Sequence, residues 1–283
     1  MNNLPVSLIL PELKQTFAEQ HSLVLQAPPG AGKTTLVPLA LLECDWLAGQ
    51  KIIMLEPRRL AARAAAERLA ELLGEPVGQT VGYRIRLDSK VSAATRIEVV
   101  TEGILQRLLQ DDPELPGVGV VIFDEFHERS LDADLGLALC VQTQQYLRDD
   151  PPLRLLVMSA TLDAEGVSRL LDDAPIITSQ GRQYPVDIRY GAPATLGRPN
   201  DAEVVQTVLR ALDEESGSVL VFLPGMAEIC RVLARLEEAL GEQQNVLLTP
   251  LYGDLNLAAQ RRAIEPVPAG QRKIVLATAI AET

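Results

Sequence analysis

Residues 22–42 read SLVLQAPPGAGKTTLVPLALL, and this stretch decides the fold class. The apolar run at 22–27 predicts a strand that is buried, because hydrophobic residues stand at successive positions. A loop with two glycines follows, and the segment from 33 to 47 predicts a helix. A strand, a glycine-containing loop and a helix in direct succession indicate an α/β unit.

The same alternation of strands and helices continues on the C-terminal side. Further apolar runs predict strands at 51–55, 96–101, 117–123 and 153–159. Helical patterns follow these strands at 58–73, 102–110, 131–148 and 163–171. Strands that are apolar at successive positions are typical of parallel sheets, which are covered on both faces. The sequence therefore predicts an open α/β sheet with right-handed crossovers.

A break in this pattern divides the chain. The segment GAPATLGRPN (191–200) has two glycines, two prolines and no periodicity, which is typical of a linker. Beyond it, strands are predicted at 218–223, 245–252 and 273–278, with helices at 201–213, 226–240 and 256–264. We predict one domain over residues 1–185 and a second, partial domain over 186–283. Because the second domain stops just past a strand, we expect the chain to be a fragment of a longer protein.

The charge is acidic overall but unevenly distributed. The 283 residues hold 26 Lys and Arg against 38 Asp and Glu, and 47% of them are hydrophobic. This composition excludes a disordered or collagen-like chain and argues against a general nucleic-acid binder. The block 51–100 is nevertheless basic, with arginines at 58, 59, 63 and 68. On charge alone this block is either a solvated helix face or a surface for a phosphate chain.

Cysteine and histidine are scarce. The three cysteines lie far apart and only two histidines are present, so we predict reduced thiols, no disulfide and no zinc site. Reduced thiols are typical of a cytoplasmic protein, and we expect a monomer. The first ten residues lack a basic region and Pro5 interrupts them, unlike a secretory signal. No apolar run approaches the ~18 residues of a membrane span.

Residues 27–35, APPGAGKTT, form a phosphate-binding motif that we call the phosphate loop. They match G-x-x-x-x-G-K-S/T except at Ala27, which replaces glycine. The glycines let backbone N–H groups surround a phosphate, and the helix start adds its positive dipole end. Lys33 is predicted to neutralise the β- and γ-phosphates of ATP, and Thr34 to ligate Mg²⁺. The predicted nucleotide-binding residues are Pro29, Gly30, Ala31, Gly32, Lys33, Thr34 and Thr35.

Two carboxylates follow the buried strand predicted at 117–123. Asp124 is predicted to hold the Mg²⁺, and Glu125 to polarise the attacking water as general base. Phosphoanhydride hydrolysis needs a metal and a positioned base, since its chemistry is mostly positioning and charge neutralisation. Taken alone, the pair could be an acidic turn after a strand. The phosphate loop earlier in the chain favours the catalytic interpretation.

Together these motifs resemble those of superfamily 2 helicases, and more narrowly those of the DEAH-box group. The phosphate loop and DEFH (124–127) match the group's first two motifs. The other segments similar to motifs of the group are EPRRLAARAAAERLA (56–70), TEGILQR (101–107), SAT (159–161), VLVFLPGMAEI (219–229) and ATAIAET (277–283). With GRQYPVDIRY (181–190), the DEFH tetrad is most similar to the bacterial HrpB-type branch.

The resemblance implies two tandem RecA-like P-loop NTPase domains with mostly parallel sheets, the second incomplete. It also implies ATP hydrolysis coupled to movement along single-stranded RNA or DNA, with RNA favoured. His127 joins Lys33 and Glu125 as a catalytic residue, because it matches the histidine that couples the nucleotide to the SAT motif. Ser159 and Thr161 match the residues that transmit this coupling.

The resemblance also assigns a nucleic-acid surface. The residues that match its backbone contacts are Arg58, Arg59, Thr101 and Thr278. Arginines at a strand-to-helix turn can face a strand laid across the carboxyl edge of the sheet, which agrees with this assignment. Arg68 stands where the group often places an adenine-stacking arginine, although a helix-surface arginine explains it equally well.

The chain departs from the pattern of the group at three places. Ala27 is a mild change, whereas Ala279 replaces the usual asparagine and puts one polar contact in doubt. No arginine-rich sixth motif is present, and in the group this motif supplies the arginine finger, which is worth on the order of 10³–10⁵ in rate. We therefore expect the chain to bind Mg²⁺-ATP, hydrolyse it poorly and not unwind.

Two other functions fit parts of the sequence. The chain could be a P-loop ATPase that drives a partner other than nucleic acid, although such a motor has no need for the arginines at 58 and 59. It could also be a non-catalytic nucleotide-binding module. ATP hydrolysis measured with and without single-stranded RNA discriminates among the three.

Overall fold

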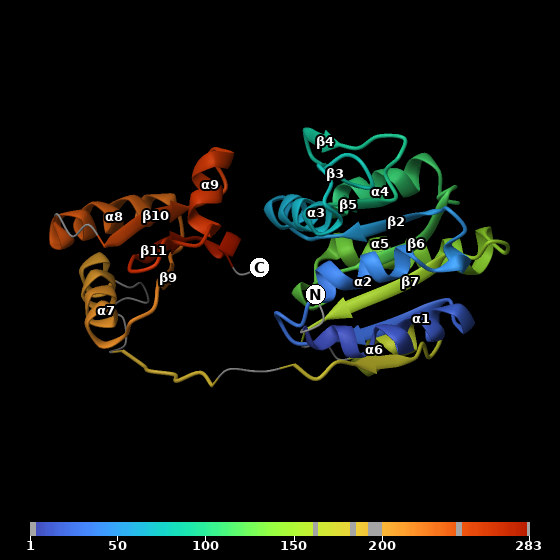
Figure 1. The fold of residues 1–283 in the computed structure, drawn as a ribbon, viewed down its shortest axis with the longest axis horizontal. Coiled ribbons are helices and arrows are strands. Elements are labelled where there is room, and N and C mark those ends of the chain that lie inside the picture. The colour runs from blue at the N-terminus through green and yellow to red at the C-terminus, as the bar shows by residue number, and fades with distance from the viewer. Residues whose placement is uncertain (1–3, 161–163, 182–184, 192–199, 242–244, 282–283) are drawn as a thin grey trace. The chain divides into compact units, whose positions relative to one another are not determined.

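The computed structural model describes residues 4–160, 164–181, 185–191, 200–241 and 245–281 (Figure 1). The chain forms two compact units, Met1–Pro185 and Val186–Thr283. Thr161, which the sequence analysis assigned to coupling, lies outside the described residues.

The first unit is built on an eight-stranded sheet in the order β4-β3-β5-β2-β6-β7-β1-β8. All neighbouring strands are parallel except β3 and β4. The strands are β1 (Ser22–Gln26), β2 (Lys51–Leu55), β3 (Val81–Ile85), β4 (Asp88–Lys90), β5 (Ile97–Val100), β6 (Val118–Phe123), β7 (Arg154–Ser159) and β8 (Ile176–Thr178). The predicted α/β class with a mostly parallel sheet is confirmed.

Helices cover both faces of this sheet, as the apolar strands require (Figure 1). The helices are α1 (Leu10–Glu19), α2 (Lys33–Leu42), α3 (Arg59–Leu73), α4 (Glu102–Asp111), α5 (Leu131–Gln142) and α6 (Ala164–Leu170). One buried core includes residues of α1, α2 and α3, and another includes residues of α4, α5 and α6. None of the helices described in either unit is long and apolar enough to cross a membrane.

Specific side-chain contacts explain where α2 ends and where α5 begins. The helix predicted over 33–47 stops at Leu42, and a 3₁₀ turn follows at Asp45–Leu47. Trp46 in this turn stacks on Phe17 of α1, with ring centroids 5.8 Å apart, so a tertiary contact replaces the last helical turn. The α5 helix begins directly after its N-cap Ser130, whose side chain accepts a hydrogen bond from the Ala133 N–H.

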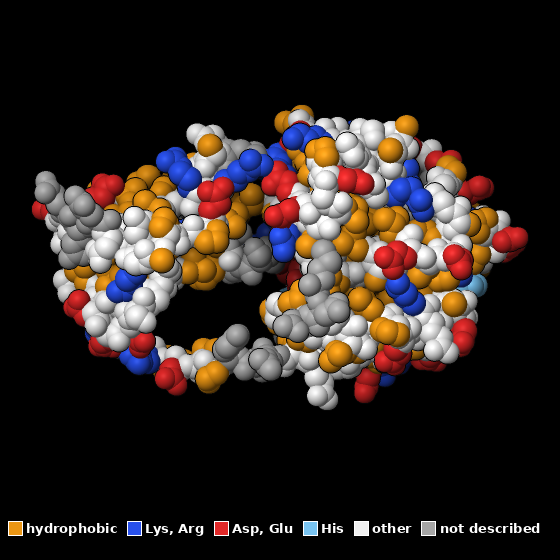
Figure 2. All heavy atoms as spheres, in the orientation of Figure 1, with side chains coloured by type: hydrophobic (Ala, Val, Ile, Leu, Met, Phe, Trp, Pro, Cys, Tyr) orange, Lys and Arg blue, Asp and Glu red, His pale blue; other side chains and the backbone are white. Residues whose placement is uncertain are grey.

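The second unit has a three-stranded parallel sheet in the order β10-β11-β9. Its elements are α7 (Asp201–Glu214), β9 (Val219–Phe222), α8 (Met226–Leu240), β10 (Val246–Leu251), α9 (Leu257–Ile264) and β11 (Arg272–Ala277). A core of α7, α8 and β11 side chains covers one face. Leu220, Phe222 and Leu247 remain about half exposed on the strands, and hydrophobic side chains show at the surface of this unit (Figure 2).

Candidate functional site

The phosphate loop leaves the carboxyl end of β1 and runs into α2. Gly30 and Gly32 have φ angles of 73° and 91°, in the left-handed region that side chains other than glycine disfavour. A Cβ on Gly32 would also lie 2.8 Å from Cδ1 of Leu4. Both glycines are therefore required by the local backbone. They bring Lys33 to the first position of α2, where its side chain is buried.

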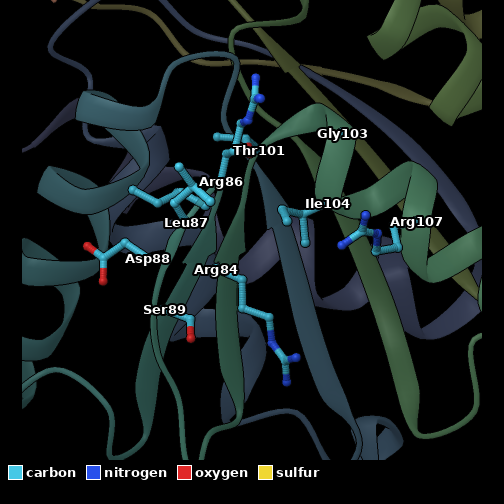
Figure 3. A pocket seen from close by; sticks show the side chains of 10 residues that line it. Arg84, Arg86, Leu87, Asp88, Ser89, Thr101, Gly103, Ile104 and Arg107 are labelled. Carbon is cyan, nitrogen blue, oxygen red and sulfur yellow. The ribbon is translucent and has the colours of Figure 1, made fainter. Parts of the chain in front are cut away.

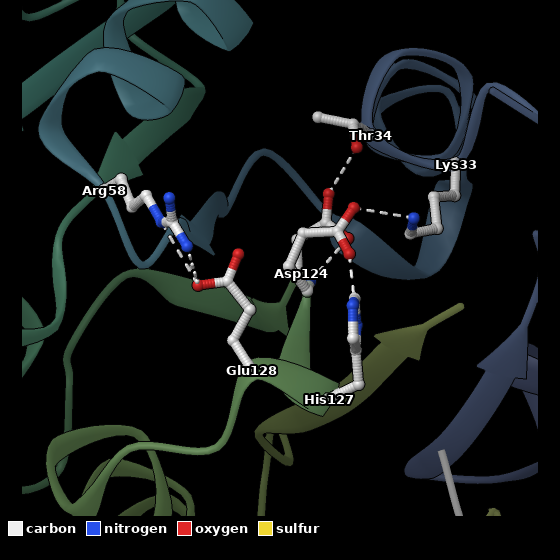
Figure 4. A network of polar contacts seen from close by, with 7 residues as sticks. Lys33, Thr34, Arg58, Asp124, His127 and Glu128 are labelled. Carbon is white, nitrogen blue, oxygen red and sulfur yellow. Dashed lines mark hydrogen bonds and ion pairs between the residues drawn. The ribbon is translucent and has the colours of Figure 1, made fainter. Parts of the chain in front are cut away.

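Lys33 and Thr34 meet the two carboxylates that follow β6 (Figure 4). The Lys33 ammonium donates to Oε1 of Glu125 at 2.7 Å. The Thr34 hydroxyl donates to Oδ2 of Asp124 at 2.5 Å. Because β1 and β6 are parallel, with β7 between them, both strands end at the same edge of the sheet. Two residues of the phosphate loop thus pair with the two carboxylates, Lys33 with Glu125 and Thr34 with Asp124.

Burial dominates the electrostatics of Asp124. Desolvation raises the pKa of its carboxyl above the ordinary value, and the negative charge of Glu125 raises it further. Lys33 and the Thr34 hydroxyl oppose these effects. The Glu125 N–H also donates to Oδ1 of Asp124, at 2.8 Å. A buried carboxylate with this environment is stabilised by any cation that binds beside it.

Glu56 is a third carboxylate in this cluster, and the sequence analysis did not identify it. It follows β2 directly and is only 3% exposed. Burial raises its pKa well above the ordinary value, and the charge of the hydrogen-bonded Asp124 raises it further. The available signal was its position after a buried strand, the same position that Asp124 occupies. It becomes informative only once β2 and β6 are known to be neighbours.

Glu56→Gln is expected to raise the thermal unfolding midpoint near pH 8 by roughly 2–4 °C, the shift that about 1 kcal/mol gives in a domain of this size. Folding raises the pKa of Glu56 above its ordinary 4.5, so its contribution to stability is present below that value and is lost as pH rises through the folded pKa. Glutamine keeps the shape of the Glu56 side chain and cannot ionise. The rise in the unfolding midpoint should therefore grow as the pH increases from about 4.5 to 8, and scanning calorimetry across this pH range measures it.

The exposed Glu114→Gln serves as the matched control for this substitution, because its carboxyl is not buried. Its unfolding midpoint should follow that of the unmodified chain at every pH. A Glu56→Gln midpoint that does not change with pH relative to this control contradicts the assignment.

The turn after β6 brings His127 to the same cluster. Glu125 has a φ of 48°, which places a residue with a long side chain in the left-handed region. The 3₁₀ turn Phe126–Glu128 follows, and Nδ1 of His127 lies 3.2 Å from Oε2 of Glu125. Glu125 thus contacts Lys33 through one oxygen and His127 through the other. Ser159 ends β7 beside Gln26 of β1 and is buried.

Arg58 also reaches the turn after β6 (Figure 4). Its Nε and Nη2 donate to Oε2 of Glu128, at 3.3 and 3.1 Å. Arg58 is the N-cap of α3, and Arg59, the first residue of that helix, is exposed. The contact with Glu128 was not predicted from the sequence. It joins a predicted nucleic-acid residue to the turn that carries Glu125.

The other predicted nucleic-acid residues lie at ends of elements. Thr101 is the N-cap of α4 and lines a cavity of about 720 Å³ (Figure 3). Arg84, Arg86 and Arg107 line the same cavity, from β3, the turn after it and α4. These arginines were missed, although two of them belong to the basic block 51–100. Thr278 belongs to the second unit, where its N–H donates to the Leu251 carbonyl.

Comparison with known proteins agrees with these motifs. The family model described as DEAD/DEAH box helicase matches residues 9–170. The chain is 55% identical, over all its 283 residues, to the ATP-dependent RNA helicase HrpB of Escherichia coli (strain K12), and it covers 34% of that protein. It is 39% identical to the pre-mRNA-splicing factor ATP-dependent RNA helicase prp22 of Schizosaccharomyces pombe, with 99% of the chain and 24% of that protein covered.

Solved structures give the same result. The crystal structure of the Escherichia coli DEAH/RHA helicase HrpB has a TM-score of 0.90 and 54% identity, and the match covers 99% of this chain and 35% of that one. A structure of the Escherichia coli DExH-box NTPase HrpB has a TM-score of 0.79 and 53% identity, with 100% and 34% covered. The chain therefore spans about a third or less of the length of these relatives.

Proposed function

Since the chain belongs to the DEAD/DEAH box helicase family, we propose that it carries the nucleotide site of a helicase that couples the hydrolysis of Mg²⁺-bound ATP to movement along single-stranded RNA. Because these 283 residues hold no arginine-rich sixth motif, we expect them to hydrolyse ATP slowly. The observation that carries the proposal is the cluster of Lys33, Thr34, Asp124 and Glu125 at one edge of the first sheet. These residues come from two motifs 90 or more positions apart.

The cluster fits a magnesium nucleotide. The Thr34 hydroxyl and the Asp124 carboxylate are adjacent oxygen donors, which Mg²⁺ prefers. Bound Mg²⁺ neutralises charge on the phosphates. Lys33 donates to Glu125, and we propose that its ammonium also contacts the phosphates of bound ATP. In this proposal Glu125 accepts a proton from water, and the His127 imidazole lies 3.2 Å from its second carboxylate oxygen.

The proposed RNA surface lies on the first unit. Arg58, Arg59 and Thr101 offer donors at the start of two helices, and the cavity beside Thr101 adds three arginines. Contacts of this kind are made to phosphates and sugars, so they carry little sequence information. We therefore propose binding that depends on salt and not on base sequence.

ATP hydrolysis measured with and without single-stranded RNA tests the proposed function. Stimulation by RNA of unrelated sequences is the expected result, and a weaker response to single-stranded DNA is expected. An ATPase that no RNA or DNA stimulates contradicts the helicase proposal and favours a motor that acts on another kind of partner. A chain that binds ATP without hydrolysing it, in any of these conditions, favours a nucleotide-binding module.

Replacing both Arg58 and Arg59 with alanine should weaken RNA binding by about tenfold or more near 0.1 M salt. Two lost phosphate contacts should also flatten the slope of log affinity against log salt by about 1.4, at about 0.7 per contact on single strands. The loss should be equal for unrelated sequences. Fluorescence anisotropy of labelled oligonucleotides, measured over a salt series, gives both quantities.

The matched control for this pair replaces Arg169 and Arg235, two exposed arginines outside the candidate site, with alanine. It removes the same charge, so it separates local contacts from the effect of net charge. If the two double variants lose the same affinity, Arg58 and Arg59 make no specific contact with the strand.

A further inference from the structure

Gly181 lies against the phosphate loop, although it is 146 or more residues from it in the sequence. A Cβ built on Gly181 would lie 2.1 Å from Cγ of Pro28 and 3.3 Å from its Cβ and Cδ. Carbon atoms in contact are normally about 3.5–4.0 Å apart, so no side chain fits here unless the backbone or the loop moves. The Pro28 ring cannot rotate away as a flexible side chain could.

The contact is fixed by strand pairing. Thr178, the last residue of β8, pairs with Gln26, the last residue of β1. The Ser179 N–H then donates to the Gln26 carbonyl at 2.8 Å, and Ser179 is buried. The segment 179–181 therefore continues beside the chain that enters the phosphate loop. The carbonyl of Ser159, on the other side, accepts from the Ala27 N–H at 2.9 Å.

The need for glycine at this position is purely steric. Its φ lies outside the left-handed region, unlike those of Gly30 and Gly32, so the backbone itself would accept alanine. What alanine cannot do is occupy the space that Pro28 fills. Residues 179–181 thus lie directly against the phosphate loop.

We propose that Gly181 is a positioning residue for the nucleotide: because it has no side chain, the segment 179–181 can brace Pro28 and keep the phosphate loop in its binding geometry. This inference rests on the proposed function, since it takes the loop to bind ATP. It adds that nucleotide affinity depends on a residue outside the loop. It also gives the GRQYPVDIRY segment, which the motif analysis left without a role, a contact with the site.

Gly181→Ala is expected to weaken binding of a fluorescent ATP analogue by about tenfold, since overpacking displaces the phosphate loop. Gly191→Ala is the matched control: this glycine lies ten positions further along the chain, in the second unit, and a Cβ there meets no atom within 4 Å. Its affinity should equal that of the unmodified chain. Titration of the full chain, followed by fluorescence, measures each dissociation constant.

Pro28→Ala separates this role from a general loss of folding. It removes Cγ and Cδ, the two ring atoms that alanine does not share, and leaves only Cβ, 3.3 Å from the new methyl group. The effect of Gly181→Ala should therefore shrink from about tenfold to less than about threefold in the Pro28→Ala background. Thermal unfolding of all four proteins without nucleotide shows whether affinity and stability change together.

Two results would overturn the proposal. One is a Gly181→Ala affinity equal to that of the unmodified chain. The other is an effect of Gly181→Ala that is the same in both backgrounds, because the contact with Pro28 would then not be its cause. If the unmodified chain does not bind the analogue at all, the proposed function fails instead, so the two failures are distinguishable.

Discussion

Lys33→Ala is expected to weaken ATP binding by at least about 100-fold, because it removes the buried cation that we propose to contact the phosphates. The ammonium is desolvated, since its side chain is only 5% exposed. A charge held in such an environment interacts far more strongly than one in water. The substitution also leaves Glu125 without its cation, so two negative groups would face each other when the nucleotide enters. Isothermal titration calorimetry with a slowly hydrolysed ATP analogue measures the loss.

Lys14→Ala is the control for this prediction. Lys14 also pairs with a glutamate, Glu43, at 2.9 Å, but this pair is at the surface, with the Glu43 side chain 75% exposed. Exposed pairs contribute about 0–1 kcal/mol, so nucleotide affinity should be unchanged. Retention of ATP binding by Lys33→Ala at the level of this control would remove Lys33 from the nucleotide site.

Glu125→Gln should reduce ATP hydrolysis by about 10²–10⁴-fold while it keeps ATP binding, because the amide cannot accept the proton from water. Binding is expected to stay the same or become somewhat tighter. The substitution removes the carboxylate that pairs with the Lys33 ammonium, so this ammonium is available to the phosphates. It also removes one negative charge from the proposed phosphate site. Single-turnover hydrolysis of labelled ATP, with protein in excess, detects even a slow reaction and separates it from binding.

Glu114→Gln is the control for the change from carboxylate to amide, since this residue is exposed and lies outside the cluster. It should hydrolyse ATP at the rate of the unmodified chain. Hydrolysis by Glu125→Gln at that rate would exclude Glu125 as the general base. A loss of binding as large as the loss of hydrolysis would instead assign Glu125 to holding the nucleotide site together.

Most strands of the first unit could be predicted because they are buried on both faces. A run such as GVGVVIF at 117–123 is apolar at nearly every position, and it forms the strand β6. The hairpin of β3 and β4 was missed. It lies at the edge of the sheet, where Arg84 and Lys90 are tolerated and no apolar run marks the strand. The short strand β8, on the opposite edge, was missed as well.

Some residues of the candidate site could be predicted from the sequence, and others could not. Lys33, Thr34, Asp124 and Glu125 could be predicted because a loop motif and a strand end identify them without any knowledge of the strand order. Glu56 and Gly181 could not be predicted in this way. Their importance depends on β2 lying beside β6 and on β8 lying beside β1, and the order of strands along the chain does not reveal either neighbour.

Glu125 combines a strained, left-handed backbone with the proposed role of general base. At this position the stability of the fold and the rate of ATP hydrolysis therefore favour different residues. A non-glycine residue with this φ costs roughly 1–2 kcal/mol, and glycine or asparagine would pay less of it. Neither of these residues can act as a base. Glycine at this position would therefore stabilise the fold and remove the proposed general base.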